Sequence, residues 1–383
     1  MLYGNNDRAL NGICPYFTMF PVDFPRSLLA ARGERDGWVF DPFCGRGTTN
    51  FAARLSNLPS IGMDSSPVAV AIAQAKVANT SPREIMGAAV ELLDEVDQPV
   101  DVPEGEFWEW AFSPDVLVVL CRLREGLMRD CRSDARKALR AILMGALHGP
   151  TPKHKASYFS NQSPRTYAPK PGYAVRFWKV RDLKPRSVDV LAIVHERSQR
   201  YFGAKLPRGK GWILAGDSRD PAAVEAAVQG RALRWVITSP PYYGLRTYIP
   251  DQWLRQWFVG GHAEVDYSSD GQIRHASPGI FSQELRTVWR NVARVCRADA
   301  ELVIRFGGIR DRKAEPLPLL LESLVGSGWE VRSITSAGSA SQGRRQAESF
   351  ARTKQPPFEE HDVLAVLADE SVSSWQSQAE GMH

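Results

Sequence analysis

Residues 37–49 constrain the fold of this chain more than any other stretch. They read Gly-Trp-Val-Phe-Asp-Pro-Phe-Cys-Gly-Arg-Gly-Thr-Thr, a short apolar strand that enters a turn with two glycines, and apolar residues at helical spacing follow. Because only glycine lets the backbone come this close to a ligand, the pattern predicts the ligand-binding end of a doubly wound α/β fold. The third glycine of the dinucleotide fingerprint and the phosphate-binding Gly-x-x-x-x-Gly-Lys-(Ser/Thr) are both missing, which argues against nicotinamide and nucleoside triphosphates.

A second stretch ends a buried strand abruptly. Residues 235–242 read Trp-Val-Ile-Thr-Ser-Pro-Pro-Tyr. The two prolines fix two φ angles at about −65° and remove two backbone donors, so nearby carbonyls are free to accept hydrogen bonds. Tyr242 then offers a ring face. Taken alone, Pro-Pro also marks ordinary loops, so this stretch has a purely structural interpretation as well.

Together the two stretches resemble the S-adenosylmethionine-dependent amino-methyltransferases of DNA. Residues 41–49 look like the first motif of that family, and residues 239–242 look like the fourth, (Ser/Asn/Asp)-Pro-Pro-(Tyr/Phe) at the end of a parallel strand. The resemblance implies a Rossmann-like class I methyltransferase fold with a mostly parallel sheet, S-adenosylmethionine as cofactor, and no metal. It also implies the catalytic residues Ser239, Pro240, Pro241 and Tyr242.

Three further segments fall where the resemblance requires them. Residues 60–64 read as a strand that ends in Asp64, an acid able to accept hydrogen bonds from both ribose hydroxyls. Residues 15–21 resemble the tenth motif, which packs over the methionine end of the cofactor, and residues 211–218 place Asp217 where the family meets the adenine amine. Each aspartate alone could be a turn or cap residue. The cofactor residues implied by the resemblance are Thr18, Phe20, Asp41, Pro42, Phe43, Cys44, Gly45, Gly47, Thr48, Thr49, Asp64, Ser65, Asp217 and Ser218.

Composition agrees with a folded enzyme. The 383 residues suffice for a catalytic domain and a large insertion, and 43% apolar with 24% charged residues is ordinary for a soluble protein. No run of 18 apolar residues and no leader are visible, so we expect a cytoplasmic protein. The five cysteines form no Cys-x-x-Cys pair, which predicts neither a disulfide framework nor a zinc cluster.

Charge is distributed unevenly along the chain. Residues 84–109 carry nine acids and no Lys or Arg, whereas residues 122–186 carry sixteen Lys and Arg against four acids. Apolar residues at helical spacing predict helices over residues 114–128 and 133–147. We interpret the arginines of these two helices as solvated helix faces rather than a nucleic-acid surface.

Residues 149–186 interleave cations with aromatic residues and six prolines. Cations neutralise phosphates and rings stack on bases, so we expect a long irregular loop that contacts DNA, the alternative being a plain packed excursion. Behind the catalytic loop, Arg246 is placed to meet a phosphate or a flipped nucleotide. The expected DNA-binding residues are Lys153, Lys155, Arg165, Tyr167, Lys170, Arg176 and Arg246.

The remaining pattern alternates between helix and strand, which predicts a mostly parallel sheet covered by helices on both faces. The expected elements are a helix over residues 281–295, a strand over 300–306, a helix over 318–324, and strands over 329–334 and 362–368. We expect four parts: a cofactor-binding half (1–80), a target-recognition insertion (81–210), a catalytic half (211–370) and a disordered tail (371–383).

The resemblance implies methylation of the exocyclic N4 amine of a flipped cytosine in double-stranded DNA, in a restriction-modification system whose cognate endonuclease acts separately. Adenine-N6 methylation is the nearest alternative, because serine occurs in some of those relatives. The motif order is that of the alpha class, whereas serine enzymes more often carry the catalytic half first, so motif order does not decide the base. Methylation of RNA or protein and a non-catalytic DNA-binding module are further alternatives. Cytosine-C5 methylation needs a cysteine nucleophile, typically behind proline, and Cys296 has none before it.

Overall fold

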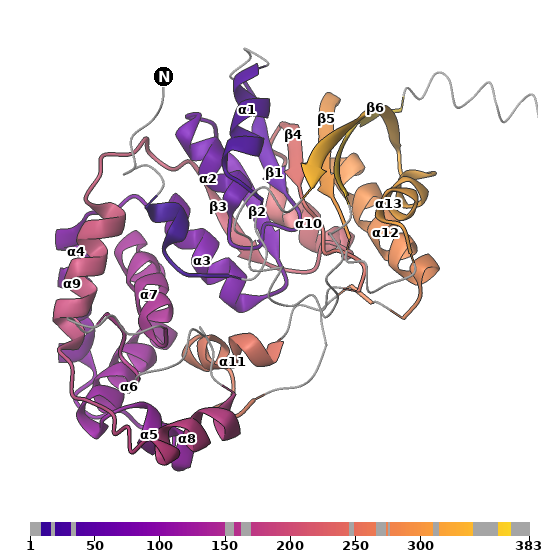
Figure 1. The fold of residues 1–383 in the computed structure, drawn as a ribbon. Helices are drawn as coiled ribbons and strands as arrows, with labels where there is room; N and C mark the ends of the chain where they lie inside the picture. Colours follow the sequence, from indigo (N-terminus) through magenta and orange to yellow (C-terminus); the bar gives the residue numbers. More distant parts are fainter. Residues whose placement is uncertain are drawn as a thin grey trace, which may run out of the picture. The chain divides into compact units, whose positions relative to one another are not determined.

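The computed structural model describes residues 9–16, 20–31, 36–149, 157–161, 170–244, 249–265, 273–274, 276–308, 314–339 and 359–368, except for the side chains of residues 249–251 and 339. The chain divides into two compact units (Figure 1). The sheet unit comprises Phe17–Ser66, Lys210–Thr247 and Gly271–His383, and the helical unit comprises Met1–Tyr16, Pro67–Gly209 and Tyr248–Asp270. The four-part division expected from the sequence stays a prediction.

The sheet unit contains a seven-stranded sheet in the order β3-β2-β1-β4-β5-β7-β6. Neighbouring strands from β3 to β5 pair in parallel, and β7 pairs antiparallel with both β5 and β6. The sheet is therefore mostly parallel, and the predicted Rossmann-like α/β class is confirmed. The strands are β1 (Trp38–Asp41), β2 (Ser60–Asp64), β3 (Gly211–Ala215), β4 (Leu233–Thr238), β5 (Cys296–Phe306), β6 (Trp329–Ser339) and β7 (Glu359–Leu367).

Each face of the sheet has its own hydrophobic core, because successive strand residues point to opposite sides. Phe40 and Val236 belong to a cluster with residues of α10, α12 and α13, whereas Val39 and Ile237 pack with residues of α1 and α2. Helices thus cover both faces, as the alternating pattern predicts (Figure 1). The helices of this unit are α1 (Asp23–Ala31), α2 (Thr48–Leu55), α10 (Pro221–Val228), α12 (Pro278–Val295) and α13 (Pro316–Leu324).

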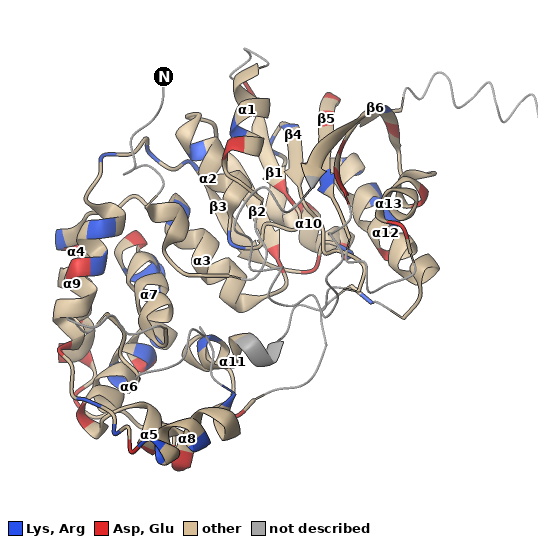
Figure 2. Ribbon diagram, viewed as in Figure 1, with Lys and Arg blue, Asp and Glu red and all other residues tan. Residues whose placement is uncertain are grey.

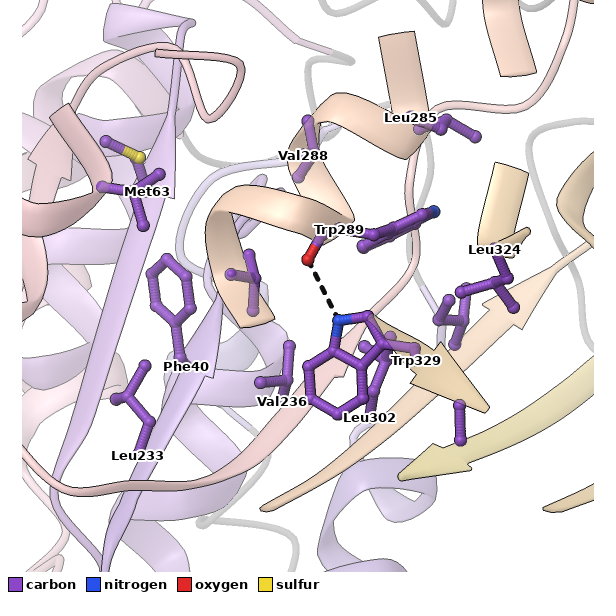
Figure 3. Packing of buried hydrophobic residues seen from close by; sticks show 14 of the residues in the cluster. Phe40, Met63, Leu233, Val236, Leu285, Val288, Trp289, Leu302, Leu324 and Trp329 are labelled. Atoms are coloured by element: carbon purple, nitrogen blue, oxygen red, sulfur yellow. Dashed lines mark hydrogen bonds between the residues drawn. The ribbon is translucent and has the colours of Figure 1, made fainter. Parts of the chain in front are cut away.

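Two tryptophans lie in the core cluster that contains Phe40 and Val236, near the antiparallel strands (Figure 3). The indole N–H of Trp329 donates to the backbone carbonyl of Trp289 at 3.0 Å, and the Trp289 indole donates to Ser323 Oγ at 3.0 Å. Both large rings are buried with their polar atoms satisfied, which is the condition under which tryptophan stabilises a core.

The helical unit packs around aromatic residues. Trp108 lies with ring centroids 4.6 Å from Trp257, and Phe107 lies 4.9 Å from Trp253. No helix among the described residues is long and apolar enough to cross a membrane. Two helices of the helical unit, α6 and α7, are the ones predicted from apolar spacing. The helices of this unit are η1 (Leu10–Gly12), α3 (Pro67–Val77), α4 (Pro82–Glu95), α5 (Glu106–Ala111), α6 (Pro114–Arg129), α7 (Asp134–Ala146), α8 (Pro171–Val180), α9 (Val190–Phe202) and α11 (Ile249–Phe258).

The expectation of an irregular loop over residues 149–186 is wrong for its second part, where α8 forms. Pro171 occupies the first helical position, where proline's fixed φ and missing N–H cost nothing. Ala174, Val175 and Trp178 then bury one face of the helix. Trp178 and Phe159 are almost completely buried. Part of the aromatic content that suggested base stacking therefore belongs to the core of the helical unit.

Candidate active site

Four neighbouring parallel strands of the sheet unit end at the same edge. Asp41 is the last residue of β1 and Asp64 the last residue of β2, Asp217 follows β3, and Ser239 follows β4. Carboxyl ends of parallel strands form the usual ligand edge of an open α/β sheet. Apart from Thr18, which lies outside the described residues, all the predicted cofactor and catalytic residues are described within the sheet unit.

The glycine turn behind β1 takes the conformation that its sequence predicts. Gly45 and Gly47 have φ of 50° and 72°, in the left-handed region, and Gly47 is the N-cap of α2. A Cβ added at Gly45 would meet no atom closer than 4.0 Å, so there is open space over this residue. A Cβ at Gly62 would instead run into Asn50 and Cys44, so the absence of a side chain there lets β2 lie against the turn.

Asp41 is completely buried beneath the turn. Its Oδ1 accepts hydrogen bonds from Thr238 Oγ1 at 2.6 Å and from the Phe43 N–H at 3.1 Å. Burial raises the pKa of Asp41 from 3.8 to about 7, against the lowering effect of the Thr238 and Phe43 donors. Its Oδ2 is buried and has no hydrogen-bond partner in the described part of the chain. A buried acceptor without a donor is costly, so this oxygen suits a ligand that brings one.

Asp64 accepts hydrogen bonds through both of its oxygens, one of them from the glycine turn. Oδ2 accepts from the Gly45 N–H at 2.8 Å and Oδ1 accepts from the Ser66 N–H at 2.9 Å. Burial nevertheless outweighs these donors and raises the pKa of Asp64. Each carboxylate oxygen can accept a second hydrogen bond, so hydroxyl donors from a ligand remain compatible with this geometry.

Asp217 accepts more side-chain hydrogen bonds than its position after a strand suggests. Arg219 donates to Asp217 through Nε at 3.0 Å to each oxygen and through Nη2 at 2.5 Å. Burial opposes ionisation, but Arg219 holds the pKa of Asp217 below its usual range. The same guanidinium donates to Glu284 Oε2 at 2.8 Å. Next to it, Ser218 is buried and donates to the Pro42 carbonyl at 2.7 Å, which joins the β3 and β1 loops.

Several aromatic and hydroxyl side chains predicted to bind the cofactor make contacts within the protein. The Phe43 ring packs against Trp289 of α12, with centroids 5.9 Å apart, and the Phe20 ring lies 5.6 Å from Phe24 of α1. Thr49 Oγ1 donates to the Ile237 carbonyl at 3.1 Å. These contacts fix the turn to its surroundings, while Ser65 is exposed beside it.

The Ser-Pro-Pro-Tyr loop leaves β4 at the same edge. Ser239 is half-buried and Pro240 is buried. The Tyr242 ring meets Phe306 at the end of β5 edge to face, with centroids 5.4 Å apart, and its hydroxyl donates to Glu360 Oε1 at 3.1 Å. The loop therefore carries a half-buried hydroxyl, two prolines that have no backbone donor, and an aromatic ring held by Phe306 and Glu360. These are groups suited to a flat amine.

Four residues of this site were not predicted from the sequence. They are Thr238, Asn50, Arg219 and Glu360. Thr238 could have been inferred as a strand-terminal hydroxyl beside Ser239, and Asn50 as a polar residue among apolar ones in α2. Both amide atoms of Asn50 are buried and unpartnered among the described atoms, which places a second polar group below the turn. No local signal points to Glu360, which is 118 residues from Tyr242.

The predicted DNA-binding residues are only partly described. Lys170 and Arg176 are exposed at α8 in the helical unit, whereas Lys153, Lys155, Arg165, Tyr167 and Arg246 lie outside the described residues. Lys and Arg occur beside Asp and Glu on the helices of the helical unit (Figure 2). Three of these cations pair with the acidic segment 84–109, so the charge asymmetry partly serves this unit's own structure. The pairs are Arg136 with Glu95, Arg124 with Asp101, and Lys179 with Glu106.

Comparison with known proteins bears on one end of the chain. Residues 3–75 match the family model N6_N4_Mtase, described as DNA methylase. The matched segment contains the glycine turn and Asp64 and ends before the Ser-Pro-Pro-Tyr loop. The match supports a relation of this segment to the DNA amino-methyltransferases. No curated protein sequence matches the chain.

Several solved structures are similar to the chain in outline. The rRNA methyltransferase aviRa from Streptomyces viridochromogenes has 14% identity and a TM-score of 0.38, covering 93% of this chain and 88% of its own. The magnesium protoporphyrin IX methyltransferase ChlM from Synechocystis PCC 6803, with bound SAM, has 10% identity and a TM-score of 0.33, covering 91% of this chain and 78% of its own. At such low identity and TM-score these likenesses carry no inference about activity.

Proposed function

We propose that this protein is an S-adenosylmethionine-dependent DNA methyltransferase that acts on the exocyclic N4 amine of a cytosine flipped out of the duplex. One observation carries the proposal: the glycine turn of β1 and the Ser-Pro-Pro-Tyr loop of β4 leave neighbouring strands at one edge, and Thr238 bonds Asp41 across them at 2.6 Å. The family match over residues 3–75 supports the same function.

The residues around the turn fit this cofactor. The cationic and N–H groups of S-adenosylmethionine are donors that match the buried, unpartnered Oδ2 of Asp41. The ribose hydroxyls of the cofactor are donors that match the spare lone pairs of Asp64. The open space over Gly45 leaves the backbone accessible to a ligand. When bound, the cofactor would supply an electrophilic methyl group on a sulfonium. Asp41, Asp64 and the Gly45–Gly47 turn would hold it in place, with Asp217 shared between Arg219 and the ligand.

The chemistry of the amine explains the catalytic loop. The exocyclic nitrogen shares its lone pair with the ring and becomes nucleophilic only when that pair is localised. The Ser239 hydroxyl and the Pro240 carbonyl would accept hydrogen bonds from its two N–H groups, and the Tyr242 ring would stack on the base and hold the nitrogen in line with the methyl group. No strong base is required, because the nitrogen turns acidic only as the methyl arrives. As the N–C bond forms and the S–C bond breaks, S-adenosylhomocysteine would be the leaving group and the excess proton would pass to solvent.

Adenine-N6 methylation is the second candidate, because the matched family model covers N6 and N4 enzymes together. The same acceptors would serve either amine. A role in restriction-modification, with a separate endonuclease, remains part of the proposal and rests on the resemblance alone.

The proposal is tested by identifying the product. Purified protein is incubated with unmethylated genomic DNA and S-adenosylmethionine carrying an isotopically labelled methyl group, and the DNA is digested to nucleosides for mass spectrometry. Labelled N4-methyldeoxycytidine is the expected product, and N6-methyldeoxyadenosine would establish the alternative. Parallel reactions with RNA and with the Ser239→Ala protein serve as controls. Label found only in RNA, or in no nucleic acid, would overturn the assignment.

A further inference from the structure

We propose that Glu360 is a positioning residue, which fixes the ring of Tyr242 by accepting a hydrogen bond from its hydroxyl. The inference rests on the proposed function, in which the Tyr242 ring stacks on the target base. It adds a residue of β7 to the predicted cofactor and catalytic residues, most of which lie at the ends of β1 to β4.

The contact joins a half-buried tyrosine to a buried acid. The Tyr242 hydroxyl donates to Glu360 Oε1 at 3.1 Å, and the Glu360 residue is only 5% exposed. Phe306 touches the same tyrosine from another side, edge to face, with ring planes at 77°. A ring held at its hydroxyl and packed against Phe306 has little freedom to rotate, so its plane is set before a base arrives.

The topology explains how Glu360 reaches the loop. Strand β7 runs antiparallel to β5, with His361 opposite Phe306, so the first residues of β7 lie at the carboxyl end of β5. This is the edge at which the parallel strands end and Tyr242 lies. An additional parallel strand would have brought its carboxyl end to this edge, whereas the antiparallel strand brings its first residues there.

Gly307 provides the space for this contact. A Cβ at this position would lie 2.8 Å from Glu360 Cγ and 3.4 Å from Tyr242 Cε2. Any side chain there would have to push one of the two partners away. A glycine directly after Phe306 thus allows the acid and the tyrosine to approach each other.

The proposal predicts coupling between the two side chains. If Glu360 acts through the tyrosine hydroxyl, Glu360→Ala and Tyr242→Phe each remove the same hydrogen bond. Each should then lower kcat/KM for DNA by about tenfold, the effect expected for removing one such bond. The double variant should be no slower than the slower single variant, because the bond can be removed only once. Glu360→Gln keeps an acceptor oxygen and should recover most of the activity.

The experiment is a double-mutant cycle on methyl transfer to unmethylated genomic DNA, with cofactor affinity measured by calorimetry and folding by thermal melting. Glu359→Ala is the matched control, because Glu359 is the adjacent exposed acid on β7 and binds Ser336 instead. If Glu360→Ala does not fold, Glu360→Met keeps the volume and removes the acceptor. Cofactor affinity should stay unchanged in all variants.

Multiplicative losses in the double variant, or full activity in Glu360→Ala, would overturn the positioning role while leaving the proposed function standing. A wild-type protein that methylates no DNA would overturn both. The two failures are therefore distinguished by the wild-type reaction, which is run first.

Discussion

Thr238 Oγ1 donates a hydrogen bond of 2.6 Å to Asp41 Oδ1, and both residues are completely buried. The bond joins the ends of β4 and β1, which are neighbours in the sheet. Because water is excluded there, the bond is electrostatically strong and its loss leaves an unsatisfied buried group. One hydroxyl thus connects the strand before the catalytic loop to the strand before the cofactor turn of the proposed enzyme.

The first prediction concerns Asp41 and pH. Burial raises its pKa to about 7 in the folded protein, against 3.8 as the ordinary value, so the folded state keeps a proton that the unfolded state has lost. The stability contributed by Asp41 is complete below pH 4 and is lost as the pH rises through about 7. Asp41→Asn should therefore gain stability relative to wild type from pH 4.5 to 7.5, by at most about 1.4 kcal/mol per pH unit, as measured by denaturant unfolding.

A second variant checks the cause. The Thr238 hydroxyl lowers the pKa of Asp41, so Thr238→Val should move the pH-dependent loss of stability to higher pH. Asp64, whose pKa is also raised by burial, contributes a dependence of the same sign, so Asp41→Asn should flatten the profile without abolishing it. A stability difference between wild type and Asp41→Asn that is constant with pH would contradict the interpretation.

The second prediction concerns the catalytic loop. Ser239→Ala removes an acceptor used mainly in the transition state, so turnover should fall by about a hundredfold or more while cofactor affinity stays within a few-fold. Steady-state kinetics and calorimetry on the same preparation separate the two quantities. Near-normal turnover would remove Ser239 from the catalytic residues.

The third prediction concerns Asp64. Asp64→Ala should weaken binding of S-adenosylmethionine by roughly 1.5 to 3 kcal/mol, the loss expected for hydrogen bonds to a charged group. Part of the effect would come from the Gly45 N–H, which loses its acceptor. Asp220→Ala is the matched control, because Asp220 is an exposed acid that caps α10 by accepting from Ala222. Calorimetry that finds unchanged affinity in Asp64→Ala would return Asp64 to a structural role.

The fourth prediction concerns the basic segment. Replacement of Lys153, Lys155, Arg165 and Lys170 by Ala should weaken binding to specific and nonspecific duplexes alike. The slope of log affinity against log salt should flatten by up to roughly 0.9 for each phosphate that the protein no longer neutralises, and cofactor affinity should not change. Arg129→Ala with Arg132→Ala is the control, because these exposed cations pair with Glu125 and Asp130 within the helical unit.

An unchanged salt slope in the fourfold variant would make the basic segment structural. The DNA surface would then have to be sought around Arg246, residues 262–274 and Arg344, of which Arg246, residues 266–272 and Arg344 lie outside the described residues.

The sequence by itself determined the local elements of this protein and the residues at the ends of its strands. Strand β1 with its glycine turn and helices α6 and α7 could be predicted from neighbours in the chain, because turns and amphipathic spacing depend on residues a few positions apart. Helix α8 was missed because prolines and aromatic residues on either side suggested a loop, and only the burial of Trp178 shows which face is inside.

Tertiary structure alone decided which side chains satisfy one another. Asp41 is held by Thr238, and Tyr242 by Glu360. These pairs are 197 and 118 residues apart, so their contact depends on strand order and on the antiparallel placement of β7. These are properties of the assembled sheet, and no local pattern in the chain encodes them, because a hydrogen-bond partner is selected by the register of strands that pair only after the chain has folded.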